Sequence, residues 1–489
     1  MKKLLAVFLA SICVFSLIAC NMDFSSQLGA ISDNILSQVV DLAGGLLKED
    51  TSIDTSGNFD SELIKETSSS TGSDVTPPDE PEPEPEPLPS PLPYERNELP
   101  LNKYIGFNAN RQTFRRRDFY GFGRLTRTTD DYLTSAHEYS FYALNALEAD
   151  VYLNFDLSKI GEEEDALYTA IEMAQMVRSF AKKYCDPYDG IYKIRRFELG
   201  NSPDKSISAE DYASLLNLCY DGNLNTEEAL EYGLIGVNPE VKMMAGNMST
   251  VDVDYVKSLM TALGSLRNDG FLPIGGWSFS YAKSGAPENY LTDAALNELI
   301  SYRDTNYSNL EIIINDLQWD TTNTESPYYV APTSDYTSEE LQCAYILRAY
   351  MILNQMGVDR SSLISFRDTE EFGYGVYDKD VNEKLSFYGI SAFYKMSLDM
   401  YLSEAVKNGE DGTYIYKYES ENGDIMYAMW ATEEGKTFPL DDFGSSYDIA
   451  SYDKSAGTYV IAENCTSFDE QPLSEMPIFI RATTNIVSE

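Results

Sequence analysis

Two apolar runs of this sequence end in residues whose side chains can act on a sugar. Glu198 and Asn201 follow one run, and Asp316 follows another, with Gln318 and Trp319 just beyond it. Two carboxyl groups that face each other can cleave a glycosidic bond, one as the acid and the other as the nucleophile or base. Amide and aromatic side chains bind sugar hydroxyls and the apolar face of a sugar ring. These residue types therefore predict a site for a neutral carbohydrate.

Polar and aromatic residues follow most of the eight strand-like segments, and together they form the candidate site. The residues that we expect to bind the sugar are Asn108, Asp156, Glu198, Asn201, Trp277, Tyr281, Gln318 and Trp319. In a barrel of alternating strands and helices, the carboxyl ends of the strands meet at the face that holds the active site. A plainer interpretation stays open, because strand ends are polar in barrels that bind nothing there.

Strand-like and helix-like segments alternate from residue 104 onward. We expect strands at residues 104–108, 121–126, 149–155, 194–200, 241–245, 272–279, 310–315 and 363–366. Helical periodicity covers residues 165–184, 209–219, 253–266, 293–302, 338–356 and 384–405. This alternation predicts an α/β fold, a (β/α)8 TIM barrel with right-handed crossovers.

The pattern changes after residue 408, where short alternating segments are divided by Gly and Asn turns. These segments are residues 414–418, 425–431, 447–452, 459–462 and 478–481. They predict a small C-terminal β-sandwich over residues 409–489, after a barrel formed by residues 94–408.

The segment Phe197-Glu198-Leu199-Gly200-Asn201-Ser202-Pro203 resembles the fourth-strand motif of the (β/α)8 glycoside-hydrolase clan that includes β-xylosidases. In that clan the Asn holds the sugar and the next residue is the Glu that acts as acid and base, but here it is Ser202. Residues 312–321 resemble the seventh-strand motif, and Asp316 stands where the clan has its nucleophile Glu. Residues 277–281 lack the His of the sixth strand. The resemblance covers most of residues 100–489.

These replacements imply that hydrolysis is impaired. A serine hydroxyl does not donate a proton usefully near neutral pH, and losing a general acid typically costs about 10²–10⁴ in rate. Asp316 is one methylene shorter than Glu, and a displacement of about 1 Å can cost a further factor of about 10². Sugar binding by Asn201 and the aromatic residues does not depend on these groups. We therefore expect a carbohydrate-binding protein whose catalytic positions, Ser202 and Asp316, are altered.

Two other functions stay open. In an active glycosidase, Asp204 or Glu198 would supply the acid and Asp316 would position a water, with carboxyl groups about 6.5–9.5 Å apart. Glu198 can equally brace the barrel interior, and Asp204 can cap the helix that follows it. Alternatively, the chain is a surface adhesion or structural lipoprotein that uses the barrel only as a scaffold, because a fold does not define a function.

The N-terminal residues predict export and a lipid anchor. Lys2 and Lys3 precede an apolar run over residues 4–19, which is a signal peptide too short to span a membrane. The ending Leu17-Ile18-Ala19-Cys20 resembles a bacterial lipobox, which implies an acylated Cys20 at an extracytoplasmic membrane surface; an ordinary signal peptide is the alternative. Residues 20–93 predict a tether, whose Pro/Glu repeat favours polyproline II at about 3.1 Å per residue.

Composition excludes several classes of ligand. With 36 Lys and Arg against 79 Asp and Glu, the net charge of −43 argues against nucleic acid and anionic polysaccharides. The single histidine, His137, cannot build a His-rich zinc site and argues against a Ser-His-Asp triad. No cysteine pair has C-x-x-C spacing, so we expect neither a metal nor a cofactor. Cys185 and Cys219 either form a disulfide or remain free thiols.

Overall fold

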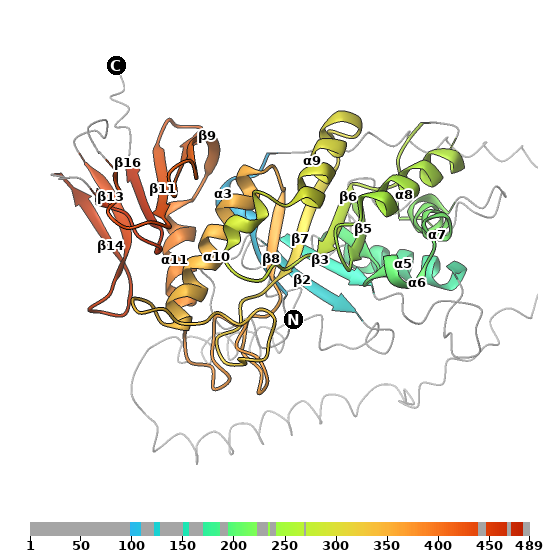
Figure 1. Ribbon diagram of the computed structural model, residues 1–489. Coiled ribbons are helices and arrows are strands. Elements are labelled where there is room, and N and C mark those ends of the chain that lie inside the picture. Colours follow the sequence, from blue (N-terminus) through green and yellow to red (C-terminus); the bar gives the residue numbers. More distant parts are fainter. Residues whose placement is uncertain are drawn as a thin grey trace, which may run out of the picture. The chain divides into compact units, whose positions relative to one another are not determined.

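The computed structural model describes residues 98–108, 122–127, 150–155, 170–185, 194–222, 233–234, 241–267, 270–438, 446–466 and 471–482. All of them belong to one unit of the chain, Glu86–Glu489. Eight parallel strands form a closed barrel in sequence order, and β1 pairs with β8 to close it (Figure 1). The strands are β1 (Ile105–Asn108), β2 (Phe122–Arg127), β3 (Asp150–Phe155), β4 (Ile194–Leu199), β5 (Lys242–Met248), β6 (Gly276–Ser280), β7 (Glu311–Leu317) and β8 (Arg360–Leu363). The predicted TIM-barrel fold is therefore confirmed.

One short helix precedes β1, and the other helices lie in connections between strands. In the part of the chain that is described they are α3 (Leu101–Tyr104), α5 (Ala170–Cys185), α6 (Pro203–Ser206), α7 (Ala209–Asp221), α8 (Val253–Leu266), η4 (Pro287–Tyr290), α9 (Ala294–Asn306), α10 (Ser338–Gln355) and α11 (Leu385–Met396). At the starts of α7, α8, α9 and α10, a side chain accepts from free backbone N–H groups. Asp252 accepts from Asp254 N and Tyr255 N at α8, and Thr337 and Glu340 form a reciprocal capping box at α10.

Charged side chains fill the floor of the barrel, at the amino ends of its strands. Arg196 of β4 binds Glu311 of β7 through two hydrogen bonds of 2.9 and 3.1 Å, and Lys242 of β5 binds the same carboxylate at 2.6 Å. Arg360 of β8 donates to Asp150 of β3 at 2.6 Å. Glu311 is 2% exposed, and its carboxylate pairs with two cations. The network therefore links β7 to β4 and β5, which are not its neighbours in the sheet.

The C-terminal residues form antiparallel sheets. A six-stranded sheet has the order β14-β13-β16-β11-β10-β9, and β12 pairs with β15 in a separate two-stranded ribbon. The strands are β9 (Met400–Asn408), β10 (Thr413–Ser420), β11 (Ile425–Ala431), β12 (Thr437–Phe438), β13 (Tyr447–Asp453), β14 (Thr458–Cys465), β15 (Gln471–Pro472) and β16 (Ile478–Ala482). One face of the large sheet packs on α10 and α11, where the rings of Phe393 and Phe479 lie 5.1 Å apart.

Two sequence predictions of element position were wrong. The eighth strand covers Arg360–Leu363 rather than residues 363–366, because Arg360 points inward to pair with Asp150 on the barrel floor. The last predicted helix, residues 384–405, ends at Met396, and Met400–Asn408 form strand β9, which pairs with β10. Consequently the C-terminal sheet begins within the segment 94–408 that was predicted as barrel.

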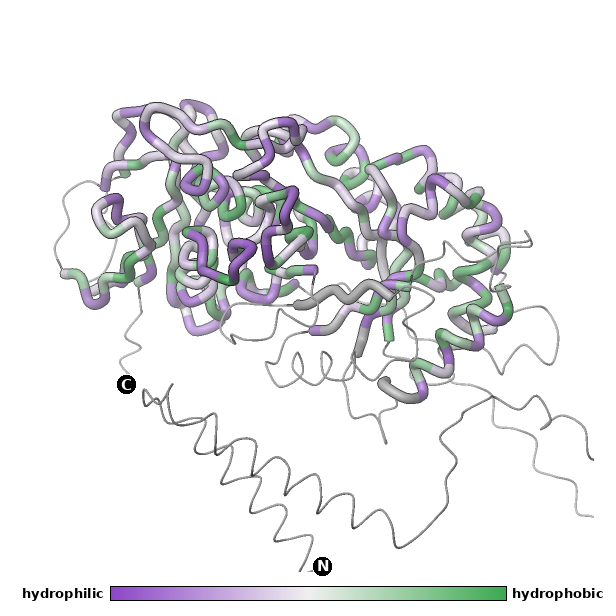
Figure 2. The backbone as a smooth tube through the Cα atoms, turned by 90° about the horizontal axis from the view of Figure 1, so that it is seen from below, coloured by the Kyte–Doolittle hydropathy of each residue, from purple (hydrophilic) through white to green (hydrophobic). Residues whose placement is uncertain are grey.

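Hydrophobic and hydrophilic residues alternate along the strands and helices (Figure 2), and the buried hydrophobic residues of both form the core. Among the described residues, no helix is long and apolar enough to cross a membrane. Cys219 and Cys343 are buried free thiols, and burial raises the pKa of both. Cys219 is therefore a free thiol in the structure, and the side chain of Cys185 lies outside what the structure describes.

Candidate functional site

Asp316 lies at the carboxyl end of β7, and its carboxylate is held by two amide groups from other strands. Asn108 of β1 donates to Oδ1 at 2.6 Å, and Asn247 of β5 donates to Oδ2 at 3.0 Å. The Asp316 residue is 8% exposed. Both amides belong to carboxyl ends of strands, so the predicted site residues Asn108 and Asp316 are brought together at the mouth of the barrel.

Local irregularities in β5 and β7 turn Asn247 and Asp316 toward the barrel mouth. Side chains alternate along a strand, so the inward-pointing Asn315 would leave Asp316 facing the helices. The pairing register shifts between Ile314 and Leu317, and Asp316 has a left-handed φ of 62°. The register of β5 shifts likewise around Asn247. Such bulges re-aim side chains beside functional sites, and a left-handed non-glycine residue carries strain that is concentrated there.

Gly246, next to Asn247, has a backbone conformation that only glycine accepts at this place. Its φ is 128°, and an added Cβ would lie 2.2 Å from the carbonyl oxygen of Ser278. The close approach of β5 and β6 therefore depends on this glycine, and with it the position of Asn247.

A buried polar network lies beneath Asp316, centred on Glu198. Glu198 is 2% exposed, and its Oε2 accepts from Asn154 at 2.8 Å. Its Oε1 accepts from Asn315 at 3.0 Å and from the hydroxyl of Ser278. Asn315 also donates to Oδ1 of Asn247 at 3.2 Å, which connects this network to Asp316. Glu198 thus braces the barrel interior, and its carboxylate does not reach out toward a ligand.

The residues after β4 occupy the fourth-strand motif but present no carboxyl group at its end. Ser202 has a left-handed φ of 58°, and its backbone N–H donates to the carbonyl oxygen of Asn247 at 2.7 Å. Asn201 is exposed. Asp204 accepts from the backbone N–H and the hydroxyl of Ser249, at 2.7 and 2.5 Å, so it links α6 to the end of β5 instead of capping a helix.

Trp277 and Trp319 are buried and offer no ring face to a sugar. Trp277 is 0% exposed and points to the helix side of β6, where it stacks on Tyr302 and contacts Tyr307 edge-on. Its neighbour Ser278 points inward, and alternation places Trp277 outward. Trp319 is 1% exposed and donates to the carbonyl oxygen of Gly285 at 2.9 Å. In this structure, therefore, neither ring is open to stacking on a sugar, in contrast to what the sequence predicts.

The remaining predicted residues are distributed around the mouth. Tyr281 follows β6, is partly exposed, and donates to Oδ2 of Asp293 at 2.7 Å; burial raises its pKa. Gln318, two residues after Asp316 in the sequence, is partly exposed. Asp156 lies outside the described residues.

The structure adds an aromatic pair that the sequence analysis missed, on the loop after β8. The rings of Phe372 and Tyr374 stack at 5.1 Å with an interplanar angle of 9°, and both residues are partly exposed. Gly373 lies between them and donates to Asp320 at 2.9 Å, which fixes the loop against the one after β7. The alternation Phe372-Gly373-Tyr374-Gly375 was the available signal, since glycines permit such close approach of loops.

Asp320 is the anchor of these two loops. Burial alone would raise its pKa, but hydrogen bonds from the backbone N–H groups of Thr322, Asn323 and Gly373 outweigh burial, and the pKa is lowered. Lys384 donates to the carbonyl oxygen of Gly373 at 3.1 Å from the other side. The loops that carry the aromatic pair are therefore held in one arrangement.

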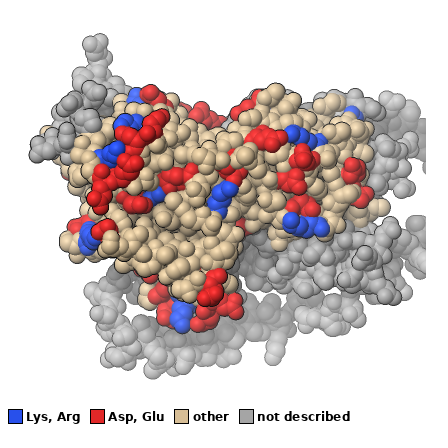
Figure 3. All heavy atoms as spheres, viewed as in Figure 1, with Lys and Arg blue, Asp and Glu red and all other residues tan. Residues whose placement is uncertain are grey.

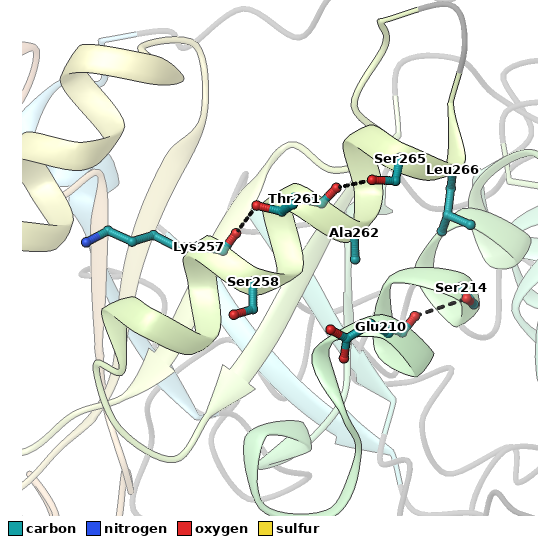
Figure 4. Close-up of a pocket in the computed structure, with 8 residues that line it drawn as sticks. All are labelled: Glu210, Ser214, Lys257, Ser258, Thr261, Ala262, Ser265 and Leu266. Carbon is teal, nitrogen blue, oxygen red and sulfur yellow. Dashed lines mark hydrogen bonds between the residues drawn. The ribbon is translucent and has the colours of Figure 1, made fainter.

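A hollow of about 510 Å³ is lined by residues of the outer helices α7 and α8 and by no strand residue (Figure 4). Its hydroxyl groups are used within the helices: Ser214 donates to the carbonyl of Glu210, and Thr261 to that of Lys257. Over the described ranges, no group of three or more His, Cys, Asp or Glu residues could hold a metal ion. The candidate site is therefore the mouth around Asp316.

Solved structures similar to this chain include glycoside hydrolases with a TIM-barrel-like fold. A family 39 glycoside hydrolase from the gut symbiont Bacteroides cellulosilyticus WH2 has a TM-score of 0.54 at 14% identity, covering 78% of this chain and 81% of that one. A glucosidase from Croceicoccus marinus has a TM-score of 0.55 at 9% identity, covering 80% and 96%. A conserved exported protein from Bacteroides fragilis also reaches 0.55 at 9% identity, covering 80% and 98%.

No protein-family model matches the sequence, and no curated protein matches it. At identities of 9% to 14%, the likeness to these structures shows the fold. The function has to be argued from the site.

Proposed function

We propose that this protein binds a neutral carbohydrate at the barrel mouth around Asp316 and that its hydrolytic activity is impaired. One observation carries the proposal. The Asp316 carboxylate is held by the amides of Asn108 and Asn247 at the place where barrels of this type bind their ligands. The fold shared with a family 39 glycoside hydrolase and a glucosidase supports carbohydrate as the class of ligand.

The surroundings of Asp316 support binding more than catalysis. Retaining hydrolysis needs a second carboxyl group about 5–5.5 Å away, and position 202 holds a serine. Both oxygens of Asp204 accept hydrogen bonds from Ser249, and both oxygens of Glu198 accept hydrogen bonds inside the barrel. Each of the two candidate acids would have to give up these partners to protonate a leaving group.

The loops after β7 and β8 supply aromatic surface in place of the two buried tryptophans. Phe372 and Tyr374 are partly exposed on a loop fixed by Asp320 and Lys384. A rigid aromatic pair can stack on the apolar face of a sugar without first being ordered, which favours affinity.

A neutral ligand agrees with the charge of the surface. Acidic groups are spread over the visible face, and basic groups are fewer (Figure 3). With a net charge of −43, an anionic polysaccharide would be repelled. As part of the same proposal, acylated Cys20 anchors the protein at an extracytoplasmic membrane surface, and residues 20–93 hold the barrel away from it.

The test combines binding and hydrolysis on the full chain in mild detergent. Wild type, Asp316→Ala and Asp316→Asn are compared on a panel of neutral plant, algal and bacterial polysaccharides, by affinity electrophoresis and by reducing-sugar release. Asp254→Ala, an exposed aspartate on the outer helix α8, is the matched control. We expect binding that Asp316→Ala weakens and Asp254→Ala does not, without sugar release.

Other outcomes identify the alternatives. Sugar release that disappears in Asp316→Asn would establish an active glycosidase, and Asp204 and Glu198 would then be tested as its acid. Binding that is the same in all variants, or absent in all, would favour a surface protein that uses the barrel as a scaffold.

A further inference from the structure

A second hollow lies on the mouth side of the barrel, between the loop after β6 and the loop after β7. Its volume is about 610 Å³, within the range of about 300–1,000 Å³ typical of ligand pockets. The residues that line it are Ala282, Lys283, Ser284, Asn289, Thr292, Asp293, Ala294, Pro327 and Tyr328. Asp316 is not among them, so the hollow is separate from the site described above.

Both walls of the hollow are attached to the strand end that carries Asp316. On one side, the backbone N–H of Tyr281 donates to the carbonyl oxygen of Asn315 at 3.1 Å, and the lining residues follow Tyr281 directly. On the other side, the backbone N–H of Asp320 donates to the carbonyl oxygen of Tyr328 at 2.9 Å. A ligand that extends from Asp316 across Tyr281 would therefore meet this hollow next.

The polar groups of the hollow are balanced in charge and fixed in place. Lys283 forms an ion pair with Asp293, whose Oδ2 also accepts from the hydroxyl of Tyr281 and whose Oδ1 caps α9 at Leu296 N. The buried hydroxyl of Tyr290 accepts from Lys283 N at 3.2 Å and donates to the carbonyl oxygen of Tyr281 at 3.0 Å. This pairing cancels the local charge and pre-organises the loop.

The chemistry of this surface suits an uncharged polyhydroxylated unit. Lys283 is 28% exposed in its side chain, so it keeps N–H groups for a ligand beyond its pairing with Asp293. Ser284 and Thr292 are exposed hydroxyl residues on the same wall, and Tyr328 presents a partly exposed ring from the opposite loop. Hydroxyl groups of a sugar match such mixed donors and acceptors, and its apolar face matches the ring.

We propose that this hollow is a second subsite that binds a distal unit of a neutral oligosaccharide whose first unit lies at Asp316. This proposal rests on the proposed function, because it takes the oligosaccharide to begin at Asp316. The hollow adds a prediction of its own about the length of the oligosaccharide. Short saccharides occupy only the mouth, whereas longer ones gain affinity from the hollow.

The experiment measures affinity against chain length by isothermal titration on the full chain in detergent. The probes are β-1,4-glucan, β-1,4-xylan and β-1,3-glucan oligosaccharides from the disaccharide to the hexasaccharide. Tyr328→Ala removes the ring, and Thr292→Trp fills the hollow from an exposed position. Tyr401→Ala on strand β9 is the matched control, and Asp316→Ala reports the mouth.

We expect Tyr328→Ala and Thr292→Trp each to weaken hexasaccharide binding about ten-fold and to leave the disaccharide affinity unchanged. The proposal is overturned if the affinity of the wild type does not increase with saccharide length. It is also overturned if both variants bind the hexasaccharide as tightly as the wild type. Asp316→Ala separates the two proposals. If it has no effect while Tyr328→Ala weakens binding, the mouth is not the site and the hollow is one.

Discussion

Asn247 connects Ser202 and Asp316, the two positions at which the sequence resemblance predicts catalytic acids. Its side-chain amide donates to Oδ2 of Asp316 at 3.0 Å, and its backbone carbonyl oxygen accepts from the N–H of Ser202 at 2.7 Å. Both Ser202 and Asp316 have a left-handed φ, at 58° and 62°. One amide residue therefore holds both positions, of which only 316 carries a carboxyl group.

Asn247→Ala should weaken carbohydrate binding while the protein stays folded. The change removes one of the two amide donors of Asp316 and leaves Asn315 without the acceptor at Asn247. A net contribution of about 1 kcal/mol per hydrogen bond predicts a loss of affinity of about five- to ten-fold. Titration with the tightest-binding polysaccharide measures this loss of affinity. Asn306→Ala, at the exposed end of α9, is the control. Equal losses in both variants would show that Asn247 does not position the site.

Trp277→Leu should have the opposite profile. Trp277 is fully buried against Tyr302 and Tyr307, so its truncation removes packing and leaves a cavity. We expect the free energy of unfolding to fall by about 2–4 kcal/mol and the sugar affinity of the folded protein to remain that of wild type. Urea unfolding and titration of the same preparation check both. A loss of affinity without a loss of stability would restore Trp277 to the binding site.

The sequence was sufficient for the barrel because its signals are local. Most of the strands contain a short apolar run, and the cap residues Asp252 and Thr337 precede the helices that they start. Asp316 was identified for the same reason, since it stands at the end of an apolar run. The face to which each side chain points was not local information, because it depends on the register of the whole barrel.

Trp277 and β9 illustrate that limit. Aromatic residues at strand ends suggest sugar stacking, but Ser278 is the inward residue of β6, and Trp277 therefore packs under α9. Residues 400–408 continue a helical pattern in the sequence, yet they pair with β10, a partner that tertiary context supplies. The register shifts that re-aim Asn247 and Asp316 likewise have no signature in composition or period.

The barrel floor should make stability depend on pH through Glu311. Burial alone would raise its pKa, but the charge and hydrogen bonds of Arg196 and the charge of Lys242 outweigh burial and hold the pKa well below its usual range. A lowered pKa means that the stabilisation is complete above the unfolded-state value of about 4.3 and is lost as pH falls below it. We expect the free energy of unfolding to decrease from about pH 5 downward.

Glu311→Gln is the variant that isolates this contribution. It leaves Arg196 and Lys242 buried without their carboxylate, so we expect a loss of about 3–5 kcal/mol at neutral pH. The variant should also show a shallower decline of stability with acid than wild type. Urea unfolding at a series of pH values gives both results. Parallel curves for the two proteins would assign the acid sensitivity to other carboxyl groups.

Arg348→Met should uncouple the C-terminal sheet from the barrel and also disturb the hollow. Arg348 is fully buried on α10. It donates to Glu288 through Nε at 2.8 Å and to Glu475 through Nη1 at 2.6 Å. Trp430 of β11 donates to the same Glu288 carboxylate at 2.8 Å. Removing the cation leaves Glu288 uncompensated, which costs about 3–5 kcal/mol. Glu475→Gln should cost less, because the Glu475 side chain is 32% exposed.

The position of Glu288 extends this prediction to binding. Glu288 lies in η4, next to Asn289, and Asn289 lines the hollow. The ion pairs of Arg348 that hold the sheet therefore also hold that loop. Arg348→Met should therefore reduce hexasaccharide affinity as Tyr328→Ala does and spare the disaccharide. Unfolding followed by tryptophan fluorescence and titration with both probes measure the two effects. If stability falls and the chain-length dependence stays that of wild type, the C-terminal sheet supports the fold of the barrel without shaping its binding surface.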